Sequence, residues 1–457
     1  MIARRQIPVG LGLILFGYLL LAILYAIRVP AWNAPDEPAH YNFIRSIAVD
    51  HRLPVLQPGD YDQQRLSRLT SEHFPASESI AGLKYESHQP PLYYLIASPV
   101  FLATEGLGER RQVIALRFVT VLIGALFILA TYRLASLVFP EATPYPLAAA
   151  AFVAFIPMHV FMDAAIDNDA LAELMVCLTL IVLVQDLAWP RVPKHDWLAG
   201  ILVGLSILTK LVAGVTVILV VAGFLGSALL AVDREKSLRQ LPIRLIRSGV
   251  VAALISGWWF VRNVWIYGIG DPVGLRRHAQ VVLGQPLTPP LNVTTLREMS
   301  LTAFHSFWGQ FGWMGIPYAD RTYDVLATLS LFVGVGVFCF ARRMLRSRDQ
   351  LDEAVDGKVT TLVFSRPQRW GLVLLALSVA CVVVGVVFYN MRYLQPQGRY
   401  LFPALPALAI FTVAGVGELI REEHVRLVFG LAVFAMVWLC IFSLYQVIGP
   451  AFAVASP

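Results

Sequence analysis

The stretch PVGLGLILFGYLLLAILYAI, residues 8–27, is an uninterrupted apolar run as long as a helix that spans a bilayer. Similar runs recur along the 457-residue chain, which is 57% hydrophobic and only 14% charged. This composition indicates a polytopic membrane protein. The first run is too long for the apolar core of a signal peptide, and no small-residue cleavage site follows it. We therefore predict an uncleaved anchor.

The predicted fold is an all-α transmembrane bundle of about eleven spans, forming a single domain over residues 1–457. The short apolar run Pro91–Leu102 is expected to lie in the interface or to re-enter, because a crossing there would reverse the side of every later loop. The spans are expected near residues 8–28, 112–139, 147–162, 168–189, 197–212, 214–232, 248–267, 323–341, 370–389, 400–418 and 427–447.

Short basic connections between the spans give the expected orientation, because positive loops stay in the cytoplasm. They are Arg4/Arg5, residues 191–195, residues 234–247 and a loop of about 342–369. The segments left outside are a long first loop of about 29–111, the turn 163–169, a loop of about 268–322, and residues 390–399. We expect a multi-pass protein of the cytoplasmic (inner) membrane with a functional site facing outside.

The first outer loop begins with Trp32-Asn-Ala-Pro-Asp36-Glu37-Pro38-Ala-His40, so two adjacent carboxylates lie beside the end of the first span. Charge next to hydrocarbon is costly, and an acidic pair there indicates a functional site. The alternative is that Asp36 only N-caps the next helix, with Pro38 in its first turn. That helix, over about 39–50, has an apolar face that suits the membrane interface, and a second polar helix is expected over 60–70.

A second acidic group lies in the turn Asp163-Ala-Ala-Ile-Asp167-Asn168-Asp169, followed by Glu173. Turn and capping chemistry explains one or two of these side chains. The larger number at one mouth of the membrane favours a functional role.

Three cations are expected on the same side as these acids, namely Lys210, Arg262 and Arg399. Each alone is also explained by a long side chain that reaches from a span end to the interface. Together with the acids they describe a pocket that is acidic at one end and cationic at the other. Arg and Lys would hold a phosphate leaving group, and a carboxylate would take a proton from an attacking hydroxyl or amine. Outside the cytoplasm the simplest donor is lipid-linked.

Several motifs, in this order along the chain, resemble the GT-C glycosyltransferase superfamily. The similarity is greatest to the protein O-mannosyltransferase and aminoarabinose-transferase branch and to related bacterial membrane proteins. The motifs are Pro35-Asp36-Glu37, His88-Gln-Pro-Pro-Leu-Tyr-Tyr94, Asn168-Asp-Ala-Leu-Ala172, Leu208-Thr-Lys210, Phe307-Trp-Gly-Gln-Phe-Gly-Trp313 and Gly398-Arg-Tyr-Leu-Phe-Pro403.

This resemblance implies an inverting transfer of a sugar from a polyprenyl- or dolichyl-phosphate donor to a lipid, polysaccharide or protein acceptor. It implies Asp36 as the general base, with Asp169 as the second acidic position and Glu37 beside them. The donor phosphate is predicted at Lys210, Arg262, Arg399 and His88. Further substrate contacts are predicted at His40, Lys84, Asn168 and Tyr93, although Tyr93 also suits an aromatic belt at the interface.

The sequence leaves both the metal content and the class of activity open. The Asp163–Asp169 cluster with Glu37 and His40 offers ligands for a divalent metal, although some relatives work without one. A transporter or flippase of lipid-linked sugars would also use intramembrane charges, but it predicts internal repeats and broken helices, which are not apparent in the sequence. A non-catalytic assembly subunit is the third interpretation. Membrane lipid is an expected partner, and nucleic acid is not.

Overall fold

A computed structural model describes residues 8–139, 143–189, 192–346 and 364–453. Arg4, Arg5 and Arg191, which contribute to the predicted orientation, lie outside the described residues. So does most of the predicted loop of about 342–369.

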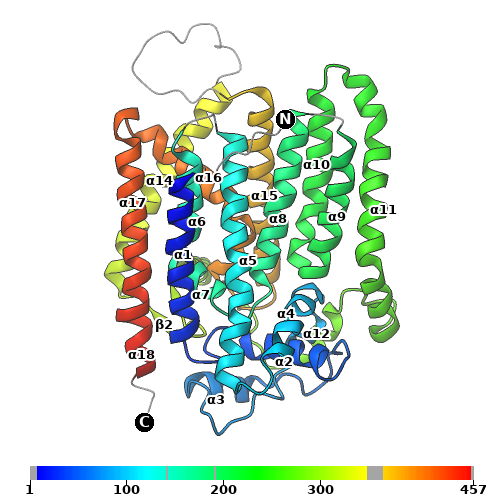
Figure 1. The fold of residues 1–457 in the computed structure, drawn as a ribbon, viewed down its shortest axis with the longest axis vertical. Coiled ribbons are helices and arrows are strands. Elements are labelled where there is room, and N and C mark those ends of the chain that lie inside the picture. Colours follow the sequence, from blue (N-terminus) through cyan, green and yellow to red (C-terminus); the bar gives the residue numbers. More distant parts are fainter. Residues whose placement is uncertain (1–7, 140–142, 190–191, 347–363, 454–457) are drawn as a thin grey trace.

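Nine helices of the described residues are long and apolar enough to cross a membrane, and they run side by side in one bundle (Figure 1). The predicted polytopic all-α fold is thereby confirmed. The helices are α1 (Val9–Arg28), α5 (Glu109–Val138), α8 (Asp169–Ala188), η2 (Leu211–Gly214) with α10 (Val215–Leu230), α11 (Arg234–Tyr267), α14 (Asp320–Arg346), α15 (Arg366–Asn390), η3 (Gly398–Ala404) with α16 (Leu405–Leu419), and α17 (Glu422–Phe442) with η4 (Ser443–Ile448) and α18 (Gly449–Ala453).

The two other predicted spans are irregular. Helices α6 (Tyr145–Ala154) and α7 (Pro157–Asp163) form one apolar segment bent by 63°. Pro157 starts α7, and a proline has no N–H with which to continue the hydrogen-bond ladder across the break. Helix α9 (Pro193–Thr209) has 17 residues and gives way to extended backbone at Lys210. Each predicted span thus coincides with a helix or a helix pair, although these two are shorter or bent.

The long loops fold into a cap at one end of the bundle. Figure 1 shows α2 (Glu37–Ala48), α3 (Gln63–Ser71), α4 (Leu92–Ala103) and α12 (Leu275–Val281) at the end opposite the connection between α10 and α11. Helix α4 covers the predicted short apolar run and has only 12 residues. The loops also supply η1 (Tyr85–His88), α13 (Val293–Trp308) and an antiparallel hairpin of β1 (Gln310–Phe311) and β2 (Ile316–Pro317), which pairs Gln310 with Pro317.

Helix α2 differs from the predicted interfacial helix. Its expected apolar side is buried, as at Phe43 and Ile44, and on the expected polar side Asn42 and Ser46 are buried too, whereas Arg45 is exposed. Asn42 donates to the carbonyl oxygens of Ile80 and Leu83 at 2.7 and 2.9 Å, because the rest of the first loop folds back over α2. The helix is therefore an inner element of the cap, and its side chains meet protein on most sides.

A buried ionic group holds three helices together at the other end of the bundle. Asp186 of α8 contacts His195 Nδ1 of α9 at 3.0 Å and Arg244 Nη2 of α11 at 2.9 Å. Arg244 Nε also donates to Asp196 at 2.8 Å. Buried charges persist where they are paired and hydrogen-bonded, so we assign this group a structural role.

Candidate active site

Asp36 lies between α1 and α2, with its backbone in the left-handed region (φ 65°). Although it occupies the N-cap position, its carboxylate accepts no capping hydrogen bond from α2 in the described chain. The Tyr85 hydroxyl donates to Oδ1 at 3.0 Å, and Arg399 Nη2 donates to Oδ2 at 2.6 Å. Helix capping therefore does not account for this carboxylate.

Arg399 joins two acidic segments. It lies on η3 at the start of α16, and its side chain is only 4% exposed. Besides the bond to Asp36, Nη1 lies 3.6 Å from Asp167 Oδ2, and Nε donates to Gln397 Oε1 at 2.7 Å. The guanidinium thus brings together the loop after α1 and the loop before α8, as the predicted mixture of acids and cations requires.

Asp169 and Lys210 form a second ion pair beside the first. Asp169 begins α8, and Lys210 follows the end of α9, where the extended backbone lets its side chain turn toward α8. The Asp169 backbone N–H also donates to Asp167 Oδ1 at 2.9 Å. Asp36, Asp167, Asp169, Lys210 and Arg399 are therefore one connected group.

A polar chain from α2 reaches the same group. The His40 ring shares a hydrogen bond of 2.8 Å with the Tyr94 hydroxyl, and its Nε2 lies 3.7 Å from Asp167 Oδ1. Asn168 Nδ2 donates to the Tyr94 hydroxyl at 3.4 Å and to the Thr209 carbonyl at 3.2 Å. The predicted substrate residues His40 and Asn168 thus lie against the connected group of Asp36, Asp167, Asp169, Lys210 and Arg399, which is the ionic group of the candidate site.

The surroundings of Asp36 and Asp167 shift the pKa values of their carboxyl groups in opposite directions. Burial raises the pKa of Asp36, but the positive charge of Arg399 and the neighbouring His40 outweigh it and hold this pKa below its ordinary value. Burial and the adjacent Asp169 charge raise the pKa of Asp167 to about 7. At neutral pH Asp36 is ionised, whereas Asp167 is poised between its two forms.

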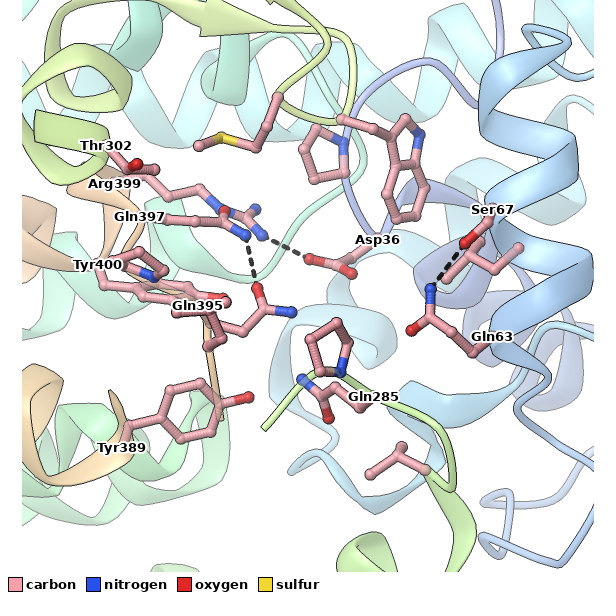
Figure 2. Close-up of a pocket in the computed structure, with 18 of the residues that line it drawn as sticks. Asp36, Gln63, Ser67, Gln285, Thr302, Tyr389, Gln395, Gln397, Arg399 and Tyr400 are labelled. Atoms are coloured by element: carbon pink, nitrogen blue, oxygen red, sulfur yellow. Dashed lines mark hydrogen bonds and ion pairs between the residues drawn. The ribbon is translucent and has the colours of Figure 1, made fainter. Parts of the chain in front are cut away.

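The Asp36–Arg399 pair lies at one side of a cavity of about 590 Å³. This volume is in the range of cavities that bind small molecules. Figure 2 shows Asp36 and Arg399 facing the space into which Gln63, Gln285 and Tyr389 also point. The cavity is formed by α3, α13, the hairpin and the segment before η3, so it lies between the cap and the bundle.

Glu37 points away from this cavity, although it follows Asp36 directly. Its carboxylate accepts from Arg117 Nε and Nη2, both at 2.7 Å, and from the backbone N–H of Trp32 at 2.8 Å and of Ile166 at 3.2 Å. Glu37 is completely buried. Its hydrogen-bond capacity is used for structure, which indicates a structural role for Glu37 rather than a catalytic one.

Of the four other predicted site residues, Lys84 and Arg262 lie apart from the ionic group, whereas Tyr93 and His88 are buried near it. The Lys84 side chain is exposed, and the Tyr93 hydroxyl bonds Thr120 Oγ1 at 2.7 Å inside the bundle. Arg262 Nη2 donates to the Pro54 carbonyl at 2.6 Å, and its guanidinium lies over the Trp259 ring. Burial lowers the pKa of His88 to about 4, so its ring is neutral and supplies no charge for a phosphate.

The structure adds three residues that the sequence did not single out. Tyr85 bonds Asp36, Glu86 lines the cavity beside it, and Asp167 contacts Arg399. Glu86 stands shortly before an apolar aromatic helix, a placement that marks an ionisable group at the level of the lipid head groups. Nothing in the sequence separates Asp167 from the other acids of its turn.

Among the residues that the structure describes, no three His, Cys, Asp or Glu side chains converge in a geometry that could hold a metal ion. Two of the predicted ligands are engaged elsewhere. Glu37 is paired with Arg117, and Asp163 accepts from the Tyr18 hydroxyl at 2.7 Å inside the bundle. The described side chains therefore supply no ready-made site for the divalent ion that the sequence left open.

The chain is similar to membrane glycosyltransferases in sequence and in fold. The profile of the family described as dolichyl-phosphate-mannose-protein mannosyltransferase matches residues 88–260. One similar structure is that of ArnT from Cupriavidus metallidurans bound to undecaprenyl phosphate. The match covers 98% of the present chain and 75% of the ArnT chain, with a TM-score of 0.51 and 15% identity. The predicted resemblance to the GT-C enzymes is thereby confirmed, and the fold is shared with ArnT.

The match to a second solved structure covers a smaller share of that protein's length. The Archaeoglobus fulgidus oligosaccharyltransferase, solved in complex with Zn and sulfate, matches 93% of this chain with a TM-score of 0.49 and 15% identity. The present chain spans 52% of that protein, about half its length. No curated protein matches the chain at a significant level.

Proposed function

We propose that this chain transfers a sugar from a polyprenyl-phosphate-linked donor to an acceptor at the outer face of the cytoplasmic membrane, with inversion at the sugar carbon. The observation that carries the proposal is the Asp36–Arg399 pair, 2.6 Å apart at the side of the cavity. The match of residues 88–260 to a family that uses a lipid-phosphate mannose supports it. So does the fold shared with ArnT, which binds undecaprenyl phosphate.

The proposed step is a single displacement. The oxygen of an acceptor hydroxyl attacks the sugar carbon bonded to phosphate, and that carbon–oxygen bond breaks with its electron pair going to the polyprenyl phosphate. The hydroxyl proton passes to Asp36. A carboxylate in this role accelerates such reactions by about 10² to 10⁴.

Two cations serve the leaving group in this proposal. Arg399 and Lys210 would contact the donor phosphate and stabilise the charge that it gains as the bond breaks. Asp169, paired with Lys210, holds that ammonium in place. When a phosphate draws Arg399 away from Asp36, the pKa of Asp36 would rise, because the pair with Arg399 is the main influence that lowers it. Donor binding would therefore make the base stronger.

His40 and Asn168 would contact the substrate, and both are held in position by the Tyr94 hydroxyl. The hydrogen bonds to the Tyr94 hydroxyl, at 2.8 and 3.4 Å, fix both side chains next to Asp167 and the Asp169–Lys210 pair. Held in this way, they would line the side of the reaction centre that faces α4.

The test is a transfer assay with the full-length protein in proteoliposomes that contain radiolabelled polyprenyl-phosphate sugar. A glycosyltransferase converts the label into a product that no longer extracts with the donor lipid. A transporter or flippase moves the intact donor from one leaflet to the other, so the label stays on the lipid. Translocation without transfer, with every acceptor class supplied, would overturn the proposal.

A further inference from the structure

Part of the lining of the cavity beside Asp36 consists of uncharged polar side chains, and this part is here called the uncharged arm. Its polar side chains come from α3, the loop before α13, the hairpin and the segment before η3, and they are Gln63, Ser67, Thr70, Gln285, Gln310 and Gln395. In Figure 2, Gln63, Gln285 and Gln395 reach toward the middle of the cavity from different sides. Amide and hydroxyl groups both donate and accept, so the arm suits a ligand that carries many hydroxyl groups.

Two residues of the cavity lining each have one acceptor atom that is buried without a partner in the described part of the chain. These atoms are Gln310 Oε1 and Glu86 Oε2. The amide of Gln310 has a fixed orientation, because its Nε2 donates to the Met314 carbonyl at 2.9 Å. A buried acceptor without a donor is costly, and a ligand that brings O–H or N–H donors would remove that cost. A phosphate or a carboxylate offers only acceptors at neutral pH.

The balance of charge around the cavity also disfavours an anionic ligand in the arm. The cavity has acidic side chains at Asp36, Glu86 and Glu298, whereas its fully charged cation is Arg399, which is already engaged with Asp36. His278 is the other basic side chain of the described lining, and burial lowers its pKa to about 3, so it is neutral. A second anion beyond the donor phosphate would meet net negative charge here.

Aromatic rings complete the lining. Tyr389 and Tyr400 pack edge to face, with 6.0 Å between ring centroids, and both border the cavity. Trp313 is fixed by a hydrogen bond of 2.9 Å from its indole N–H to the Trp32 carbonyl. Rings held in this way offer flat apolar surfaces beside polar groups, and such mixed surfaces match the C–H faces and hydroxyl edges of sugars.

We infer that the uncharged arm binds a neutral oligosaccharide, so that the acceptor of the proposed reaction is a carbohydrate. The role of the oligosaccharide as acceptor rests on the proposed function. The binding of the oligosaccharide does not depend on that function. The volume of about 590 Å³ is in the range that holds a drug-sized ligand, which leaves room for more than the single sugar of the donor.

The experiment measures direct binding to the full-length protein in lipid nanodiscs, without donor, by the intrinsic fluorescence of its tryptophans and by saturation-transfer NMR. The probes are a neutral mannose tetrasaccharide, a neutral galactose tetrasaccharide, a tetrasaccharide of galacturonic acid, free mannose, and an uncharged peptide rich in Ser and Thr. We expect at least one neutral tetrasaccharide to bind more tightly than the acidic one, the monosaccharide and the peptide.

Variants test the place of binding. Gln63→Leu and Gln310→Met each remove amide hydrogen bonds, and each should weaken binding roughly 3- to 10-fold. The matched control is Gln64→Leu, because Gln64 lies next to Gln63 on α3 but is exposed and outside the cavity lining. This control should bind as the parent protein does, and the retained thermal transition of each variant shows that it is folded.

The outcomes separate this inference from the proposed function. If the arm instead serves the sugar of the donor, mannose binds as well as the tetrasaccharides, and the intact donor displaces it. Preferred binding of the peptide or of the acidic oligosaccharide, or no binding of any neutral sugar, overturns the inference even where transfer from the lipid donor is observed. Tetrasaccharide binding without any transfer supports the oligosaccharide site but overturns the proposed function, and with it the role of the oligosaccharide as acceptor.

Discussion

Asp36 combines an unusual backbone conformation with a carboxylate whose two oxygens are bonded to Tyr85 and Arg399. Its φ of 65° lies in the left-handed region, which few residues other than glycine adopt. Asp and Asn tolerate that region better than other side chains do. The position can therefore be changed to Asn without a penalty from the backbone, which makes it a clean test of the chemistry.

The first prediction is that Asp36→Asn gives a folded protein that binds donor but transfers sugar about 10² to 10⁴ times more slowly. An amide has the shape of the carboxylate but does not take up the acceptor proton. Initial rates with labelled donor and the thermal transition of the purified variant are the measurements. The control is Asp62→Asn, because Asp62 caps α3 through Arg65 N at 3.0 Å and Asn caps equally well. A variant at Asp36 with the parent rate would return this residue to a structural role.

The second prediction concerns Arg399→Ala. Loss of one charge-assisted contact to phosphate, about 1.5–3 kcal/mol, should weaken donor binding roughly 10- to 100-fold. The change also removes the cation that holds the pKa of Asp36 low, so the acidic limb of the activity profile should move to higher pH. Arg262→Ala is the comparison, since Arg262 bonds the Pro54 carbonyl outside the cavity. Equal donor affinity in the two variants would remove Arg399 from the phosphate site.

The third prediction uses Asp167, whose pKa is raised to about 7. Below pH 7 this carboxyl is mostly protonated and neutral, whereas above pH 7 it adds a negative charge 3.6 Å from Arg399. A phosphodiester donor keeps a constant charge through this range. Its dissociation constant should therefore increase between pH 6 and pH 8, and Asp167→Asn should abolish that dependence. A parent protein with the same affinity at both values would contradict the assignment.

Among the elements, the turn between α1 and α2 is held by one buried side chain. Arg117 of α5 donates to the carbonyls of Ala26, Val29 and Pro30 at 2.8, 2.6 and 3.0 Å, in addition to the Glu37 carboxylate. These contacts use all five guanidinium N–H groups. Because this turn carries Asp36, Arg117 is a positioning residue for the candidate site.

The fourth prediction is that Arg117→Ala lowers the free energy of unfolding by about 3–5 kcal/mol, because it leaves the Glu37 charge buried without its partner. Thermal and denaturant unfolding of the purified protein measure the loss. Arg110→Ala, an exposed change on the same helix, should stay within about 0.5 kcal/mol of the parent. Adding Glu37→Gln to Arg117→Ala should recover part of the stability. A double variant as unstable as the single one would show that the carbonyl contacts dominate.

For the whole molecule, the cap and the α10–α11 connection lie at opposite ends of the bundle (Figure 1). The fifth prediction is that the cap faces outside. In a protein whose four cysteines are replaced by alanine, Ser71→Cys on α3 should react with an impermeant maleimide in intact cells. Lys236→Cys on α11 should react only after permeabilisation, as the positive-inside rule requires. The reverse pattern would place the candidate site in the cytoplasm.

The structure brings together some of the predicted site residues and leaves others apart. Asp36, Asp169, Lys210 and Arg399 form one ionic group with His40 and Asn168 beside it. Glu37, adjacent to Asp36 in sequence, faces the other way, because the first turn of α2 directs consecutive side chains to different sides. Arg262 and His88 were predicted to bind the donor phosphate. Arg262 instead donates to the backbone carbonyl of Pro54, and the ring of His88 is neutral.

The amino-acid sequence by itself determined the class, the approximate spans and the segments in which the candidate site residues lie. The length of each apolar run and the position of each charge are properties of the linear chain, and they determine how the chain inserts into a bilayer. Only the tertiary structure decided which charges meet. Asp36 and Arg399 are 363 positions apart, and the loop that follows the bent pair α6 and α7 brings Asp167 to Arg399. The energy of a buried charge depends on its nearest partners, so the role of each ionisable side chain was fixed by the packing of the helices.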